Sequence, residues 1–382
     1  MLLYLLACDA VAPVHAVRVS HGERTLLVDA SGAAEFTDIS GALKAATTGD
    51  TIEVAPGKYY GAIDFGGKAV RIVGTAGSAE TWLYATPGLP AISSKSGEGK
   101  GTIFEGFTVT GGGGKLEPVI DQSFAGLTLK DVKLTGNAGR VILYARSAMV
   151  TLDHVDFAAD NVAYEGMVIE SRRGLVTIKD STMACGTAKS GYMMEHGAVF
   201  IDGATIRCPG AIAASIYHSN GRVQRSVFDG VVAIENEESG AEPTTVEGSV
   251  FLGGVTVKLG GLTMHNSVVT GGGVSAIASK VDVDGTILFG NDCGVSDDRA
   301  NVSVSECLFF DNTENGCNTG DPVGSSGNIE GDPLFVAADD FHLSTGSPAI
   351  NMGPDSEKFR DLDGTQNDMG AYGGPFSLEG GW

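Results

Sequence analysis

The sequence predicts an all-β chain folded as one right-handed parallel β-helix, closed at its N-terminal end by a short helix. Two observations predict this fold: a composition suited to many short strands, and a repeat that runs through most of the chain. Of the 382 residues, 56 are Gly and only 19% are charged. Val, Ile, Thr and Phe recur in short runs between Gly, Asn and Asp, which is typical of strands joined by tight turns.

The repeat consists of a short strand, a polar or Gly turn residue, a small residue and a second short strand. The turn residues are Gly106, Asp131, His154, Asp180, Gly203, Arg225, Gly248, Asn266, Gly285 and Glu306. Their spacing is roughly 22 residues, the length of one three-stranded coil of a β-solenoid, and predicts about 12 coils. A β-propeller is excluded because its blades need about 40 residues or more.

The small residue after each turn should face the core, because stacked coils bury matching positions together. These positions should form one inward ladder along the molecule. They are Val132, Val155, Ser181, Ala204, Ser226, Ser249, Ser267, Thr286 and Cys307.

The chain divides into three regions. Residues 1–8 are expected to be a remnant of a lipoprotein signal, 20–330 the β-helix with its N-terminal cap, and 331–382 a C-terminal capping or anchor-like segment. Residues 38–46 are expected to form a short amphipathic helix with Ser40 as its N-cap. A solenoid has open ends that would recruit other strands, so caps at both ends are expected.

Both ends resemble known bacterial proteins. The succession Gly49-Asp-Thr-Ile52, Pro56-Gly57-Lys-Tyr59 and Val70-Arg-Ile-Val-Gly74 is similar to the start of exported β-helix proteins of the pectate-lyase-like superfamily, including pectin- and alginate-degrading enzymes. The C-terminal end resembles the choice-of-anchor Q domain of bacterial surface β-helix proteins. The segments that carry this second resemblance are 332–335, 341–343, 347–350, 361–364 and 368–372. The resemblance implies the fold and export, but no single reaction.

Cysteine positions favour an oxidising compartment. Cys185 and Cys208 each lie five residues after the turn residue, in adjacent coils, close enough for a disulfide. Cys293 and Cys317 flank the last clear coil and are expected to form a second disulfide, which leaves Cys307 as a buried thiol. Disulfides persist mainly outside the cytoplasm.

The N-terminus contains a second indication of export. Leu5-Leu6-Ala7-Cys8 resembles a bacterial lipobox, which implies a lipid on Cys8. Only seven residues precede Cys8 and none is Lys or Arg, whereas a signal peptide has a basic start and a longer apolar stretch. Either the true start lies upstream or the match is accidental. An extracellular or cell-envelope location is expected, with an outer-membrane lipoprotein as one form and the lipid as the link to the membrane.

The net charge of −22 argues against nucleic acid as a partner, because phosphate binding needs clustered Lys and Arg. It argues equally against binding to a bare anionic membrane. An acidic surface is compatible with cations and with neutral or basic ligands, or serves solubility alone. The expected partner is a polysaccharide or another cell-surface glycan, and the expected oligomeric state is a monomer.

The candidate site is a stripe of outward polar side chains between residues 140 and 238. Glu170, Arg172, Glu195 and His196 are the candidate catalytic residues. Carboxylates beside Arg and His suit cleavage of uronates, where a cation offsets the substrate carboxylate and a base takes the adjacent proton. The candidate substrate-binding residues are Tyr144, Arg146, Tyr192, Tyr217, His218 and Glu235.

Two functions remain open from the sequence. The first is glycan binding or a structural role at the cell surface. The alternative is a polysaccharide lyase or glycoside hydrolase acting on an acidic polysaccharide. Ca²⁺ is the one cofactor the sequence points to, with Asp361, Asp363 and Asp368 as candidate ligands, although Asp also simply favours turns. The sequence does not decide whether the protein is an enzyme.

Overall fold

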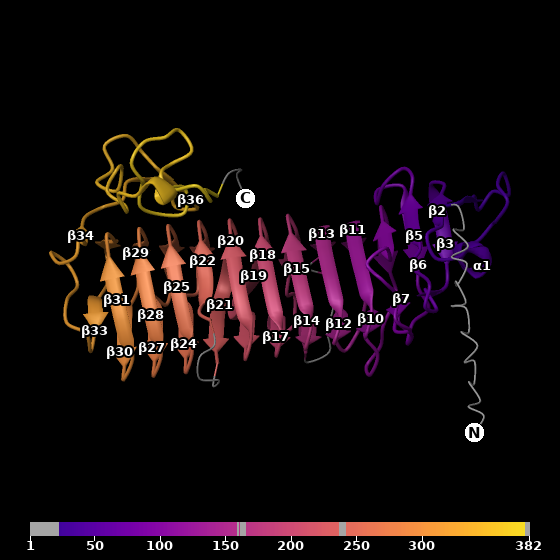
Figure 1. Cartoon of the computed structure of the whole chain (residues 1–382), viewed down its shortest axis with the longest axis horizontal. Helices are drawn as coiled ribbons and strands as arrows, with labels where there is room; N and C mark the ends of the chain where they lie inside the picture. The colour runs from indigo at the N-terminus through magenta and orange to yellow at the C-terminus, as the bar shows by residue number, and fades with distance from the viewer. Residues whose placement is uncertain (1–22, 159, 161–165, 237–241, 379–382) are drawn as a thin grey trace, which may run out of the picture.

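The fold is the predicted parallel β-helix. The computed structural model describes residues 23–158, 160, 166–236 and 242–378. Figure 1 shows a rod in which the strands run across the long axis, with α1 (Ile39–Ala45) at the N-terminal end. Neighbouring coils pair in parallel, and a complete coil contributes one strand to each of three ladders.

The first ladder has one strand from each of thirteen coils in the described chain, one more than the sequence predicts. It runs β1 (Thr25–Val28), β2 (Thr51–Val54), β5 (Arg71–Gly74), β8 (Ile103–Glu105), β11 (Gly126–Leu134), β13 (Met149–Phe157), β15 (Leu175–Lys179), β18 (Ala198–Asp202), β20 (Asn220–Gln224), β22 (Thr244–Glu247), β25 (Gly261–His265), β28 (Lys280–Asp284) and β31 (Asn301–Ser305).

The second ladder follows the turn identified in the sequence. It runs β3 (Gly57–Tyr60), β6 (Thr81–Tyr84), β9 (Thr108–Thr110), the ends of β11 and β13, β16 (Thr182–Ala184), the starts of β19 (Thr205–Tyr217) and β21 (Val227–Glu235), β23 (Val250–Phe251), β26 (Val268–Val269), β29 (Ile287–Phe289), β32 (Leu308–Phe310) and β34 (Ile329–Glu330).

The third ladder completes each coil. It runs β4 (Ile63–Asp64), β7 (Ile92–Ser94), β10 (Ile120–Ser123), β12 (Leu143–Arg146), β14 (Met167–Arg172), β17 (Ser190–Glu195), the ends of β19 and β21, β24 (Val255–Lys258), β27 (Val274–Ile277), β30 (Cys293–Asp298) and β33 (Glu314–Cys317).

The turn between the first and second ladders holds a left-handed residue in coil after coil. All ten turn residues named from the sequence have positive φ; Asp131, for example, has φ 49° and Arg225 has φ 46°. The small residues that follow are buried as predicted, from Val132 to Cys307. A second left-handed turn, between the third ladder and the next coil, was not predicted; Arg173 and His196 are two of its members.

Hydroxyl groups connect the coils where the first turn breaks the backbone ladder. Ser226 Oγ accepts a hydrogen bond from the Ala204 amide at 3.1 Å and donates one to the Gln224 carbonyl at 2.6 Å. Ser249 repeats the arrangement for the amide of Ser226 at 3.2 Å. Buried amides therefore remain paired although the chain turns away from its neighbour.

The N-terminal cap is α1, and its N-cap is Asp38 rather than the predicted Ser40. Asp38 has extended backbone angles, and its side chain accepts a hydrogen bond from the Gly41 amide at 2.7 Å. Ser40 lies inside the first turn, two positions after the cap, so it cannot serve as the N-cap. Ile39 and Leu43 face the core.

Both predicted disulfides are present, Cys185–Cys208 and Cys293–Cys317, with Cα atoms 5.0 Å and 6.1 Å apart. Cys307 is a buried free thiol, and burial raises its pKa strongly. Cys8, the predicted lipidation site, lies outside the described residues. No described helix has the length and apolar character needed to cross a bilayer.

The C-terminal segment returns along the side of the solenoid (Figure 1). It contains the two-stranded sheet β35 (Phe335–Ala337) and β36 (Asp340–Leu343) and the 3₁₀ helix η1 (Glu357–Phe359). A second hydrophobic cluster joins it to outward side chains of the second ladder. Its members are Val227, Val250, Val268, Ile287, Leu308, Phe341, Ala349, Met369, Ala371 and Leu378.

Polar contacts position this segment over the turn residues. Asn266 Nδ2 donates to Asn367 Oδ1 and to the Asp368 carbonyl, both at 2.8 Å. Two turn positions here are Gly for a steric reason. A Cβ on Gly248 would lie 1.7 Å from the Phe376 carbonyl oxygen, and one on Gly285 would lie 3.1 Å from Pro354 Cδ.

We predict that Gly248→Ala loosens the C-terminal segment. Thermal unfolding with limited proteolysis should show early cleavage within residues 331–378. The control is Gly77→Ala: Gly77 also has positive φ, but its Cβ would meet nothing within 4 Å. The control should lose only the cost of a left-handed alanine, about 1–2 kcal/mol. Equal cleavage and equal loss of stability in the two variants would show that contact between Gly248 and Phe376 does not hold the C-terminal segment in place.

Asp50 stabilises the N-terminal coil through its buried carboxylate. We therefore expect the stability of this end of the protein to fall in acid. Its carboxylate is 1% exposed and accepts a hydrogen bond from Arg24 Nη2 at 2.6 Å and one from the Thr47 amide at 2.8 Å. The pKa of an ordinary Asp is about 3.9. The hydrogen bond from Arg24 holds the pKa of Asp50 well below that value. The resulting stability is therefore complete above that value and declines as the pH falls below it.

Asp50→Asn should destabilise the protein by about 1–2 kcal/mol at neutral pH, a discounted figure because Arg24 is half exposed. The difference from the wild type should shrink below about pH 4. Urea unfolding between pH 3 and pH 7 measures it. A difference that stays constant over this range would show that the charge is unimportant.

Candidate functional site

The outward face of the third ladder contains most of the predicted site residues. Side chains there stack in two columns set by the strand register. The first column contains Tyr144, Glu170 and Met193. The second contains Arg146, Arg172, Glu195, Tyr217 and Glu235. We call these residues, with Arg140, the third-ladder surface.

Glu170 is the centre of this surface. It is only 3% exposed, although its side chain points outward from β14. Arg140 Nη1 lies 3.2 Å from Glu170 Oε2, and Arg172 Nε lies 2.9 Å from Glu170 Oε1. Two guanidinium groups therefore cover this carboxylate, as a buried charge requires.

Arg172 extends the cluster to the next coil. Its Nε also lies 3.4 Å from Glu195 Oε2, so one guanidinium contacts two carboxylates. Arg172 and Arg140 are both about half exposed. Because a guanidinium has five N–H donors, these groups can also bind an anion that approaches from solvent.

Arg140 was not predicted as a site residue. It lies in the loop before β12, outside the repeated strand pattern, so no periodic signal marks it. Its guanidinium lies 5.7 Å from the centroid of the Tyr144 ring. The contact places an aromatic ring beside the charged cluster.

The expectation that Tyr192 faces outward is wrong. Its side chain is fully buried, because Tyr192 occupies the inward phase of β17 and aligns with Ile169 and Ala214. Met193 and Glu195 take the outward phase instead. Burial raises the pKa of Tyr192 well above its usual value.

The two histidines lie on the second turn rather than on a strand. His196 and His218 both have positive φ, and their rings stack with centroids 4.8 Å apart. His196 is exposed and immediately follows Glu195. The turn therefore places an imidazole pair at the edge of the third-ladder surface.

The remaining predicted residues lie farther from Glu170 in the columns. Arg146 is exposed, and its guanidinium lies 5.8 Å from the centroid of the Phe124 ring. Glu235 forms an ion pair with Lys258 at 2.8 Å. The structure thus brings together Glu170, Arg172 and Glu195, and His196 follows Glu195 in the chain.

The carboxylates of the predicted metal ligands accept hydrogen bonds from backbone amides of the C-terminal segment itself. Asp361 accepts hydrogen bonds from the amides of Gly374 and Asp368, and Asp363 accepts one from the Thr365 amide at 2.9 Å. Asp368 accepts one from the Asn351 amide at 2.7 Å. Desolvation raises the pKa of Asp361 and of Asp368. Ca²⁺ binding there remains a prediction.

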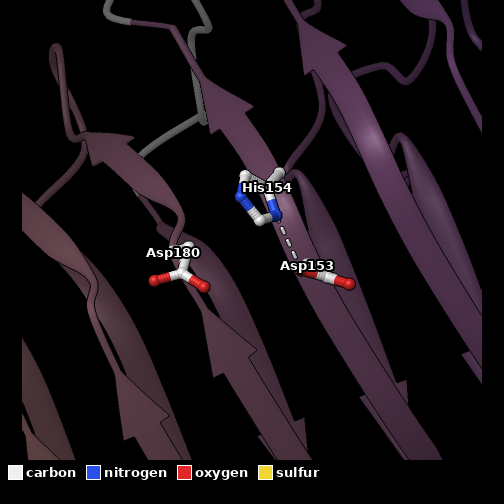
Figure 2. Close-up of side chains that lie close together, drawn as sticks. All are labelled: Asp153, His154 and Asp180. Atoms are coloured by element: carbon white, nitrogen blue, oxygen red, sulfur yellow. Dashed lines mark hydrogen bonds and ion pairs between the residues drawn. The ribbon is translucent and has the colours of Figure 1, made fainter.

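Another group, on the first turn, has the spacing of metal ligands. Figure 2 shows His154 hydrogen-bonded to Asp153 at 2.8 Å, with Asp180 on the neighbouring coil. Within the described residues, ligand atoms of these three side chains lie within 4.8 Å of one another. The hydrogen bond that the His154 ring donates to the Asp153 carboxylate raises the pKa of His154.

Comparison with one solved structure, at a TM-score above 0.5, confirms the fold. The chain is similar to a PL6 family alginate lyase, AlyGC, with a TM-score of 0.55, 12% identity and coverage of 90% of this chain and 58% of that one. It also matches the pectate lyase Pel9A with a TM-score of 0.43, 14% identity and coverage of 92% and 96%. The chain thus spans little more than half the length of AlyGC. No family model and no curated protein sequence matches it.

We predict that Glu170→Gln destabilises the protein by about 1–2 kcal/mol, because it leaves two guanidinium groups without their shared carboxylate. Glu195→Gln is the matched control. Glu195 is more exposed and, among the described residues, its carboxylate forms an ion pair with Arg172 alone, so the loss should stay below about 1 kcal/mol. Urea denaturation of both variants measures the difference. A larger loss of stability in Glu195→Gln than in Glu170→Gln would show that Glu170 is not the centre of the cluster.

Proposed function

We propose that this protein is a polysaccharide lyase that acts on an acidic, uronate-containing polysaccharide at the third-ladder surface. One observation carries the proposal: Arg140 and Arg172 converge on Glu170, and Arg172 continues to Glu195. Two half-exposed cations on an acidic chain form a local site for a carboxylate. The similarity in fold to the alginate lyase AlyGC supports this class of substrate.

The chemistry of such a site is β-elimination. A base removes the proton from the carbon next to the uronate carboxylate, the glycosidic C–O bond at the next carbon breaks, and a C=C bond forms between these carbons. The departing oxygen takes up a proton. Negative charge grows on the carboxylate during this step, so cations beside it lower the barrier.

The residues divide naturally between these roles. Arg172 and Arg140 bind and neutralise the substrate carboxylate, and Glu170 holds both guanidinium groups in place. His196, exposed and next to Glu195 in the chain, is the proposed base, because an imidazole nitrogen is the commonest general base in enzymes. Tyr144 and Tyr217 offer ring surface to neighbouring sugars on the same face.

Passive glycan binding is the second candidate. The third-ladder surface lies along an open face of the rod, and Tyr144 is held beside a guanidinium there, which suits attachment as well as cleavage. In both cases the two disulfides favour an oxidising, extracellular environment. A lipid on Cys8 remains part of this proposal for the cell envelope.

Ultraviolet absorbance of unsaturated uronates tests the proposal. Purified protein incubated with alginate and polygalacturonate, with and without Ca²⁺, should give a rising signal. Arg172→Ala and His196→Ala should each lower the rate by about 100-fold or more.

The control is Arg71→Ala. Arg71 is also half exposed and paired with a carboxylate, Glu105 at 2.7 Å, but it lies on the first ladder. This variant should retain the wild-type rate. A flat trace with all substrates, from protein shown to be folded by circular dichroism, would falsify the lyase assignment and favour passive binding.

A further inference from the structure

Three aromatic side chains gather on the outer face of the second ladder near the N-terminal end. Tyr60 and Tyr84 are paired across β3 and β6, with ring centroids 5.3 Å apart and planes 25° apart. Trp82 lies on the same strand as Tyr84, with centroids 5.9 Å apart and planes 21° apart. We call these three rings the aromatic surface.

The alternation of the strands explains why these rings face solvent. Tyr59 and Leu83 occupy the inward phase and are buried in the core. Tyr60, Trp82 and Tyr84 occupy the outward phase, and Tyr60 is 72% exposed. The next coil has Thr108 and Thr110 at the corresponding positions, so the repeat does not require aromatic residues there.

The described C-terminal segment packs elsewhere, on the coils from Val227 onward, and does not account for this surface. Clustered aromatic rings at exposed positions mark a binding surface more often than a structural need. The ring faces suit a ligand with flat apolar faces, such as a pyranose.

Positive charge beside the rings indicates which sugars would bind. Lys58 Nζ lies 5.9 Å from the centroid of the Tyr84 ring, and Lys58 aligns with Trp82. Lys133 follows two coils further along the same column and forms an ion pair with Asp156 at 3.6 Å, so Lys58 is the amine beside the rings. On a chain with net charge −22, an amine beside exposed rings favours a ligand that combines apolar ring faces with carboxylates.

We propose that Tyr60, Trp82 and Tyr84, with Lys58, form a second, non-catalytic binding surface for an acidic polysaccharide. The ligand class rests on the function proposed above, but binding here does not require cleavage. The aromatic surface lies on the second ladder and Glu170 on the third, so the two surfaces are separate faces of the rod. A long chain bound at the aromatic surface would be held near the site that cleaves it.

Tryptophan fluorescence tests the surface directly. The sequence has two Trp residues, Trp82 and Trp382, so Trp382→Phe in the 382-residue chain leaves Trp82 as the only indole. Alginate or polygalacturonate should change its emission. Tyr60→Ala in this background should weaken binding by roughly two- to tenfold, the contribution of one aromatic contact.

The matched control is Leu362→Ala, which removes an exposed apolar side chain at 63% exposure from the C-terminal segment and should leave binding unchanged. Lys58→Ala should weaken binding of the acidic chains. An unchanged emission with both polysaccharides would overturn the proposal, and equal binding of a neutral glucan would overturn the acidic ligand class. Because emission reports on Trp82 and absorbance reports on bond cleavage, failure of either proposal is seen independently of the other.

Discussion

The fold depends on a residue that accepts the left-handed conformation at the turn between the first and second ladders. This conformation costs a residue with a side chain about 1–2 kcal/mol, yet Asp131, Arg225 and Glu306 all adopt it. The cost is offset because the turn brings the next residue into the core. A hydroxyl of the following coil, as in Ser226 and Ser249, then binds its amide. The strands and their inward side chains remain in register from one coil to the next.

The sequence predicted the features that repeat. The turn residues, the inward ladder and both disulfides follow from counting positions in the repeat, because stacked coils place equal positions together. Charge reinforces that register: Glu105, Lys130 and Asp153 occupy successive coils at one outward position, so neighbouring coils present opposite charges. The second left-handed turn escaped prediction because its residues, which include Arg173 and His196, share no chemical property.

The site was only partly predictable. It depends on which face of a strand each residue occupies, which a shift of one residue reverses, and on side chains from loops. Tyr192 was assigned to the outer face, but strand alternation turns it into the core. Arg140 completes the cluster around Glu170 from a loop that no periodic pattern marks. Packing between distant segments likewise explains Gly248. A side chain at this position would collide with Phe376, which lies over 100 residues away in the sequence. A local pattern contains no information about such contacts.

The C-terminal segment makes the two ends of the rod differ in how easily their coils separate. Coils of a solenoid contact mainly their neighbours, so an unrestrained end can separate one coil at a time. Here, Phe341, Met369 and Leu378 join the outward side chains of five second-ladder strands into one cluster. The coils beneath this segment must therefore open together, after it has detached. The coils from Thr25 to Thr110 have no such strap among the described residues, so opening should begin at the N-terminal half, where the aromatic surface lies.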